Sequence, residues 1–227
     1  MKPIQFCPQA VIFDMDGLLV DSEPVWAEVE DTMLSARRVT LTHEVRQKYI
    51  GMRMTDFWRG LHENYRLSEP VENLIAEAIT GMVRRVGIEA APRPGALELI
   101  EFITEQGIPC AIASSSPMAV IDTVVEARGW GGIFTMRVSG DDVKHGKPAP
   151  DIYLEAARRL GAPPEACLAL EDSLNGTRAA VAARMVTIAV PDLAHTTADA
   201  FHGVTDFIYP SLHEVRAALE ECDFAAL

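Results

Sequence analysis

Short runs of apolar residues recur along the chain and are separated by longer segments with helical periodicity. The clearest runs span residues 10–13, 108–113, 167–170 and 186–190, and residues 136–139 and 207–209 form weaker ones. Runs without an alternation of apolar and polar residues are typical of strands that are covered on both faces. Strands that alternate with helices predict an α/β fold, a doubly wound parallel sheet of the Rossmann-like kind with right-handed crossovers.

Capping residues predict where two of the helices begin and end. Ser116 followed by Pro117 is typical of an N-cap and a first helical position, and Gly129 is expected to close that helix. The segment Ser211-Leu212-His213-Glu214 has the pattern of a capping box and predicts the start of the last helix.

One long segment interrupts the alternation of strands and helices. Residues 22–90 contain only helical patterns, whereas a crossover between parallel strands needs about a dozen residues. We therefore expect two domains, a catalytic core formed by residues 1–21 and 91–227 and an inserted all-helical cap formed by residues 22–90. The segment Pro92-Arg93-Pro94-Gly95 is rigid and turn-prone, and we predict that it links the two and makes the cap a candidate lid.

Polar side chains lie at or just beyond the carboxyl ends of the predicted strands, where ligands bind in doubly wound sheets. These are Asp14 and Asp16, Ser114, Lys147, and Glu171 with Asp172. Carboxylates crowded together repel one another, so their ionised forms persist when a cation lies among them. A cluster of oxygen ligands without histidine or thiolate indicates Mg²⁺ rather than zinc.

These residue types together predict phosphoryl transfer. The Asp14 carboxylate can attack phosphorus to form an aspartyl-phosphate, and Asp16 can protonate the leaving alkoxide and later activate water. Lys147 can neutralise negative charge, and the Ser114 hydroxyl can hold a phosphoryl oxygen near the start of a helix. Alone, each has an ordinary structural explanation, such as a turn hydroxyl or a solvated lysine, but the joint pattern favours catalysis.

The same residues resemble the four motifs of the haloacid dehalogenase superfamily. Residues 14–23 (DMDGLLVDSE) are similar to the first motif, Ser114 in IASSS to the second, Lys147 in GKPAPD to the third, and Glu171-Asp172-Ser173 to the fourth. The resemblance spans essentially the whole chain, including a helical cap inserted after the first strand. Within the superfamily the chain resembles the β-phosphoglucomutase-like branch, particularly its phosphatases of hexose, hexitol and 2-deoxyglucose 6-phosphates.

The resemblance also implies a role for each motif residue. Asp14 is the implied nucleophile and Asp16 the acid and base, with Mg²⁺ held by Asp14, the Asp16 backbone carbonyl and Asp172. Glu171 is a further candidate ligand, directly or through water. The implied substrate-binding residues of the core are Ser114, Ser115 and Lys147. An aspartate at position 16 also excludes the dehalogenases and phosphonate hydrolases of the superfamily, which carry other residues there.

The core motifs do not separate a phosphatase from a phosphosugar mutase, because both reactions use the aspartyl-phosphate. The mutases that the chain resembles carry a histidine where this sequence has Trp26, which favours the phosphatase. Trp26 is expected either to face a sugar ring or to anchor the cap. Arg53 lies in a polar break between two helical patterns, so it is a candidate for reading the substrate, against the alternative of an exposed arginine. Asn175 is expected to orient a metal-bound water or a phosphate oxygen, or to cap a helix.

Composition limits the classes of molecule that the protein is expected to bind and the cellular compartment in which it is expected to work. A formal net charge of −13 over 227 residues argues against a nucleic-acid surface and an anionic membrane, and leaves a small phosphorylated metabolite as the partner. The four cysteines are far apart, and neither a signal-peptide pattern nor a membrane span is recognisable, so a cytoplasmic enzyme is expected. A cleft within one chain predicts a monomer. A phosphoacceptor signalling domain is a distant alternative, disfavoured by the long helical insert and by Asp16.

Overall fold

Six parallel strands form one sheet in the computed structural model, which describes residues 6–42, 45–46, 49, 52–194 and 196–221. The strands are β1 (Ala10–Phe13), β2 (Cys110–Ser114), β3 (Met136–Ser139), β4 (Cys167–Glu171), β5 (Val186–Ala189) and β6 (Phe207–Ile208). Their order is β3-β2-β1-β4-β5-β6, and each neighbouring pair is parallel. A strand overlaps every apolar run singled out in the sequence, which confirms the doubly wound α/β fold.

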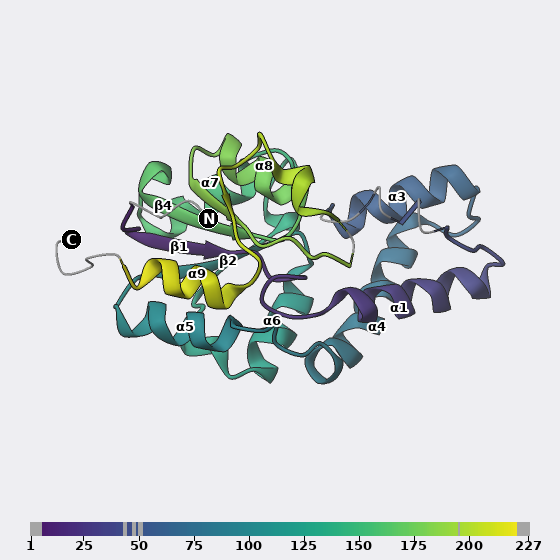
Figure 1. Ribbon diagram of the computed structural model, residues 1–227. Helices are drawn as coiled ribbons and strands as arrows, with labels where there is room; N and C mark the ends of the chain where they lie inside the picture. Colours follow the sequence, from purple (N-terminus) through teal and green to yellow (C-terminus); the bar gives the residue numbers. More distant parts are fainter. Residues whose placement is uncertain (1–5, 43–44, 47–48, 50–51, 195, 222–227) are drawn as a thin grey trace.

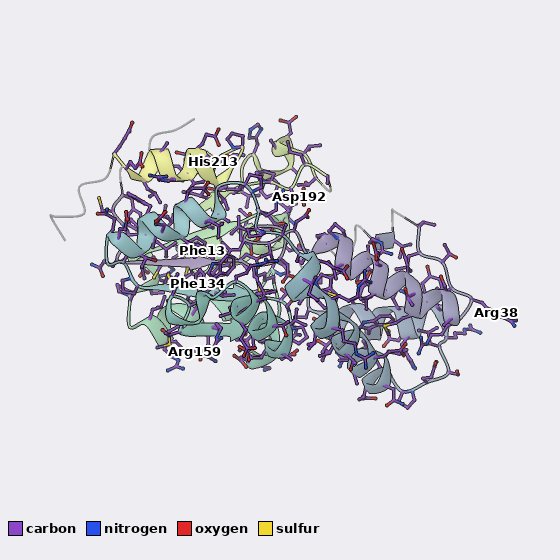
Figure 2. The ribbon with its side chains drawn as sticks, turned by 90° about the horizontal axis from the view of Figure 1, so that it is seen from below. Phe13, Arg38, Phe134, Arg159, Asp192 and His213 are labelled. Atoms are coloured by element: carbon purple, nitrogen blue, oxygen red, sulfur yellow. The ribbon has the colours of Figure 1, made fainter. Side chains whose placement is uncertain are left out.

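Helices cover both faces of the sheet (Figure 1). One face carries α5 (Ala96–Glu105), α6 (Met118–Ala127) and α9 (Leu212–Leu219), and the other carries α7 (Asp151–Leu160) and α8 (Leu174–Ala182). On β1, Val11 and Phe13 pack toward the first face, and Ala10 and Ile12 toward the second. Phe13 meets the ring of Phe134 edge to face at 5.6 Å (Figure 2). Burial on both faces explains why the sequences of the inner strands β1, β2, β4 and β5 lack a polar alternation.

A second group of helices lies beyond the carboxyl ends of the strands (Figure 1). It consists of α1 (Glu23–Ala36), α3 (Met54–Tyr65) and α4 (Val71–Glu89), which we call the helical lobe. Trp58, Leu61, Leu74 and Met82 are buried between these helices, and α4 also packs against α6 of the core. Arg38 lies at the far end of the lobe (Figure 2).

The two segments that connect the lobe to the sheet run side by side. Val20 and Pro92 form an antiparallel bridge. The amide of Asp21 donates to the Ala91 carbonyl at 2.8 Å, and the amide of Arg93 donates to the Leu19 carbonyl at 2.9 Å. The path into the lobe and the path out of it are therefore tied together at one place, which is the geometry of a narrow double linker.

The predicted ends of α6 and α9 can be compared with the structure, and one of them differs by a residue. Helix α6 begins one residue later than expected, with Pro117 as its N-cap, because the Ser116 side chain hydrogen-bonds elsewhere. Gly129 has a φ of +69° directly after this helix, as a closing glycine should. At α9 the Ser211 hydroxyl accepts from the amide of His213 and bonds the Glu214 carboxylate, so the predicted N-cap is confirmed.

Four short 3₁₀ helices also lie within the described residues. They are η1 (Trp130–Gly132), η2 (Gly140–Asp142), η3 (Pro164–Ala166) and η4 (Ala198–Phe201). Within the part of the chain that the structure describes, none of the helices combines the length and the apolar character needed to cross a bilayer.

Candidate active site

The carboxylates predicted from the sequence meet where the order of the strands reverses, between β1 and β4. Asp14 directly follows β1, Glu171 ends β4, and Asp172 is the next residue. Phe13 pairs in register with Leu170, so the two strands end at the same level. Asp14, Glu171 and Asp172 each offer a carboxylate oxygen, and these oxygens lie within 4.8 Å of one another. Ligand sites of doubly wound sheets form at this kind of switch point.

Lys147 reaches into this cluster from the loop that follows β3. Its Nζ donates to an oxygen of Asp14 and to one of Glu171, both at 2.5 Å, and to the Ala113 carbonyl at 3.2 Å. The three ammonium donors therefore have three acceptors, and the side chain is 2% exposed. Burial acts to lower the pKa of Lys147, but the two carboxylates outweigh it and raise the pKa, so the ammonium stays charged.

Glu171 is fully buried and accepts hydrogen bonds on both carboxylate oxygens. Oε1 accepts from Lys147 and, at 2.7 Å, from the hydroxyl of Tyr153. Oε2 accepts from the amide and the hydroxyl of Ser173, at 3.2 and 3.0 Å. The sequence reasoning missed Tyr153, although a tyrosine on the buried face of an amphipathic helix needs a partner for its hydroxyl. The arrangement lets Glu171 hold the Lys147 ammonium against Asp14.

The Asp16 carboxylate is held by four donors at the mouth of the site. Oδ1 accepts from the Ser22 hydroxyl at 2.6 Å and from the Trp26 indole at 3.2 Å, and Oδ2 accepts from the Ser114 and Ser116 hydroxyls, both at 2.8 Å. The structure therefore brings Asp16, Ser114 and Trp26 together. Ser22 and Ser116 were not singled out as Asp16 partners from the sequence, although each lies within a recognised motif.

The cluster fits a hard divalent cation, as the sequence predicts. Burial raises the pKa of Asp14 and that of Asp172 well above the ordinary range, and neighbouring carboxylates add to both shifts, while Lys147 opposes them. A cation among these oxygens would favour their ionised forms. The turn after β1 is shaped to admit Asp172, because a Cβ on Gly17 would lie 2.3 Å from its Oδ2. Metal ligation by Asp14, Asp172, Glu171 and the Asp16 backbone stays a prediction.

A pocket that is partly open to solvent lies between this cluster and the helical lobe. Its core side is lined by Asp14, Asp16, Ser115, Ser116, Asp172 and Ser173, and its lobe side by Glu23, Trp26, Glu30, Arg46, Tyr49, Met52, Met54 and Phe57. Glu23, Trp26 and Glu30 follow one another at intervals of three and four residues on α1. This spacing places side chains on one face of a helix, so it was a signal available in the sequence.

The charges on the lobe side of the pocket are largely paired. Arg46 bonds Glu30 through Nη1 and Asp31 through Nη2, the latter at 2.6 Å. Burial, with Asp16 and Glu30 nearby, raises the pKa of Glu23 to about 8. Burial also raises the pKa of Glu30 to about 7, although Arg46 acts in the opposite direction. The environment on this wall therefore opposes additional negative charge.

Arg53 lies outside the pocket lining and bonds the core instead. Its Nη1 donates to the carbonyls of Gly140, Val143 and Lys144 at 3.3–3.5 Å, and its Nε donates to Asp56 at 2.9 Å. These carbonyls belong to residues 140–147, which we call the Lys147 loop. Arg53 thus connects the lobe with this loop, and its role in binding substrate stays a prediction.

The other predicted residues have varied surroundings. Ser115 lines the pocket, and Asn175 lies in the first turn of α8, where Ser173 rather than Asn175 is the N-cap. Burial raises the pKa of the Cys110 and Cys167 thiols to about 11, so both are unreactive buried groups. Cys222 lies outside the described residues.

Comparison with known proteins agrees with this geometry. A family model for haloacid dehalogenase-like hydrolases matches residues 8–184. Hexitol phosphatase B of Escherichia coli (strain K12) is 36% identical over 189 residues, 80% of this chain and 83% of that protein. The phosphorylated carbohydrates phosphatase of Thermotoga maritima is 31% identical over 175 residues, 77% of this chain and 81% of that protein. Among solved structures, CbbY of Rhodobacter sphaeroides in complex with phosphate has a TM-score of 0.83 and 28% identity, covering 94% of this chain and 100% of that one.

Proposed function

Because the chain belongs to the haloacid dehalogenase-like hydrolase family, we propose that it is a Mg²⁺-dependent phosphatase of small sugar phosphates. The substrates we propose are monoesters of hexoses, hexitols or deoxysugars, and the reaction passes through an aspartyl-phosphate on Asp14. The observation that carries the proposal is the contact of Asp14 with Lys147 at the floor of a pocket, with Asp172 and Asp16 beside it. The similarity to two carbohydrate-phosphate phosphatases supports the substrate class.

In the first half of the proposed reaction, a carboxylate oxygen of Asp14 attacks phosphorus and the bond from phosphorus to the ester oxygen breaks. The leaving alkoxide takes a proton from the Asp16 carboxyl. Lys147 holds Asp14 in place and balances its charge and that of the phosphoryl group. Mg²⁺ held by Asp14 and Asp172 would supply further positive charge that offsets the repulsion between the nucleophile and the phosphate.

In the second half, the Asp16 carboxylate accepts a proton from water while the water oxygen attacks phosphorus. The bond from phosphorus to the Asp14 oxygen breaks, which releases inorganic phosphate and restores both carboxyl groups. In the described state, hydroxyls of Ser22, Ser114 and Ser116 hold Asp16. To meet the ester oxygen its carboxyl must turn toward Asp14, and the freed hydroxyls of Ser114 and Ser116 are then available to phosphate oxygens. We propose that residues 22–90 act as a cap whose position over the pocket accompanies this change.

A phosphosugar mutase is the second candidate, because it would use the same Asp14 chemistry. The indole of Trp26 contacts Asp16 at 3.2 Å, at the position where the mutases that the chain resembles carry a histidine. An indole N–H donates only, so it holds Asp16 without exchanging protons with it. This favours water as the acceptor. Incubation with β-glucose 1-phosphate and a bisphosphate primer separates the two, since conversion to glucose 6-phosphate without release of phosphate would overturn the phosphatase.

A panel of sugar, polyol and nucleotide monophosphates with Mg²⁺ tests the proposed function. We expect phosphate release from sugar or polyol monoesters, its loss in Asp14→Asn, and its near loss in Asp16→Asn. Asp199→Asn is the control, because Asp199 is exposed and lies on η4 outside the pocket lining. Undiminished turnover by Asp14→Asn would refute Asp14 as the nucleophile. The cofactor is tested separately: EDTA treatment should abolish phosphate release, and readdition of Mg²⁺ should restore it.

A further inference from the structure

The lobe side of the pocket carries an ion pair whose position bears on substrate choice. We propose that the Glu30–Arg46 pair makes the site selective for monophosphates with an uncharged, hydroxyl-bearing remainder and makes it reject sugar bisphosphates. This inference rests on the proposed function, and it adds the residues that limit the substrate class.

The position of the pair is the first support. Glu30 and Arg46 line the same pocket as the proposed nucleophile Asp14, on its lobe side rather than its core side. Their side chains are 13% and 21% exposed, so both are largely withdrawn from bulk water. A sugar phosphate bound with phosphorus at Asp14 would direct its remaining atoms toward this wall. The part of the substrate farthest from the reacting phosphate therefore meets Glu30 and Arg46.

The charge on this wall is the second support. Arg46 is the one cationic side chain among the described residues that line the pocket, and its guanidinium already bonds Glu30 and Asp31. Glu23 adds another carboxyl group to the same wall. A second phosphate group would carry roughly two negative charges into this partly desolvated region. There it would compete with the Glu30 carboxyl group for the Arg46 guanidinium. The raised pKa of Glu23 and of Glu30 has the same physical origin, a wall that disfavours negative charge.

The groups on this wall suit a neutral polyol. Carboxyl oxygens of Glu23 and Glu30 can accept hydrogen bonds from sugar hydroxyls, and the Arg46 donors can supplement them. The remaining lobe side chains in the lining present apolar and aromatic surfaces that can cover the C–H face of a sugar: Trp26, Tyr49, Met52, Met54 and Phe57. A hydroxyl end group is thus accommodated, whereas a phosphate at the same place is not.

Matched pairs of substrates test the selectivity directly. Glucose 6-phosphate is compared with glucose 1,6-bisphosphate, and fructose 6-phosphate with fructose 1,6-bisphosphate, so that each pair differs by one phosphate group. We expect kcat/KM of the wild type to be at least 10-fold higher for the monophosphate of each pair. Affinities of Asp14→Asn for the same four compounds with Mg²⁺, measured by calorimetry, repeat the comparison without turnover.

The Glu30→Gln variant tests which residues are responsible. The amide removes one negative charge and loosens the hold on Arg46, so the ratio of monophosphate to bisphosphate kcat/KM should fall at least 10-fold. Asp31→Asn is the matched control, because Asp31 bonds the same guanidinium but is 61% exposed and lies outside the pocket lining. Its ratio should stay within about threefold of the wild type. A ratio within one preparation is independent of the folded fraction, so partial misfolding of a variant does not obscure the result.

The outcomes separate the inference from the proposed function. Equal use, or equal binding, of monophosphate and bisphosphate by the wild type would overturn the inference while leaving the phosphatase intact. An unchanged ratio in Glu30→Gln, or an equal change in Asp31→Asn, would overturn the assignment to the Glu30–Arg46 pair. Absence of phosphate release from every monoester would refute the proposed function, and the calorimetric comparison would still decide the inference.

Discussion

Replacing Glu171 by glutamine tests whether this residue serves mainly to hold Lys147. Glu171 accepts four hydrogen bonds, from Lys147, Tyr153 and two groups of Ser173. Glutamine offers one acceptor oxygen and places an NH₂ group where the second carboxylate oxygen was. The two donors that bonded to that oxygen would then face an NH₂ group, so at least one buried hydrogen bond is lost. The Lys147 ammonium keeps Asp14 as its remaining anionic partner.

The magnitude follows from the burial of the pair. Removing one partner of a buried ion pair typically costs about 3–5 kcal/mol, and the contact with Asp14 that Lys147 retains places Glu171→Gln near the lower end, about 3 kcal/mol. For a protein of this size, 1 kcal/mol corresponds to roughly 2–4 °C in Tm, so a decrease of about 6–12 °C is expected. Activity should fall about 100-fold, because Lys147 is no longer fixed and binds Asp14 without a second carboxylate to balance it.

Thermal unfolding and the Mg²⁺ concentration for half-maximal activity together test the assignment. If Glu171 acts through Lys147, Glu171→Gln lowers Tm and kcat but changes the half-saturating Mg²⁺ concentration by less than about threefold. Asp172→Asn is the comparison variant, and its Mg²⁺ requirement should rise at least 10-fold, because the amide loses the charge that binds the cation. A Glu171→Gln variant with unchanged Tm and a strongly raised Mg²⁺ requirement would refute the reasoning and identify Glu171 as a metal ligand.

Two other substitutions test features that only the structure reveals. Gly17→Ala should raise the half-saturating Mg²⁺ concentration at least 10-fold, because a Cβ there would lie 2.3 Å from an oxygen of Asp172 and the φ of +82° disfavours alanine by about 1–2 kcal/mol. Gly131→Ala, whose added Cβ meets nothing within 4 Å, is its control and should leave the Mg²⁺ requirement unchanged. Arg53→Ala should raise KM about 10-fold with a smaller change in kcat, because the guanidinium connects the lobe with the Lys147 loop. Arg59→Ala removes an exposed arginine of α3, the helix that Arg53 precedes, and should change neither. A kcat loss without a KM change in Arg53→Ala would contradict a role in holding the lobe.

The sequence alone determined the sheet and the side chains at its switch point. Strands covered on both faces are continuous apolar runs, and the residue after such a run must lie at the carboxyl edge of a parallel sheet. Local sequence thus sufficed to place Asp14 and Glu171, and the parallel arrangement then brought them together with Asp172. Lys147 was predictable as a charged residue beyond the end of a strand. The three oxygen atoms that accept hydrogen bonds from its ammonium group were not predictable.

The tertiary structure decided how the helical lobe faces this cluster. The lobe is attached through the double linker, so its orientation depends on packing between residues distant in sequence, such as α4 against α6. For this reason a polar break between helices suggested Arg53 as a candidate for reading the substrate, whereas the structure places Arg46 in the pocket lining and Arg53 in contact with the Lys147 loop. The same packing brings Glu30 into the pocket that Asp14 also lines. The sequence determines the chemistry at the strand ends because strand position is local information, and the docking of the lobe determines which side chains meet the rest of the substrate.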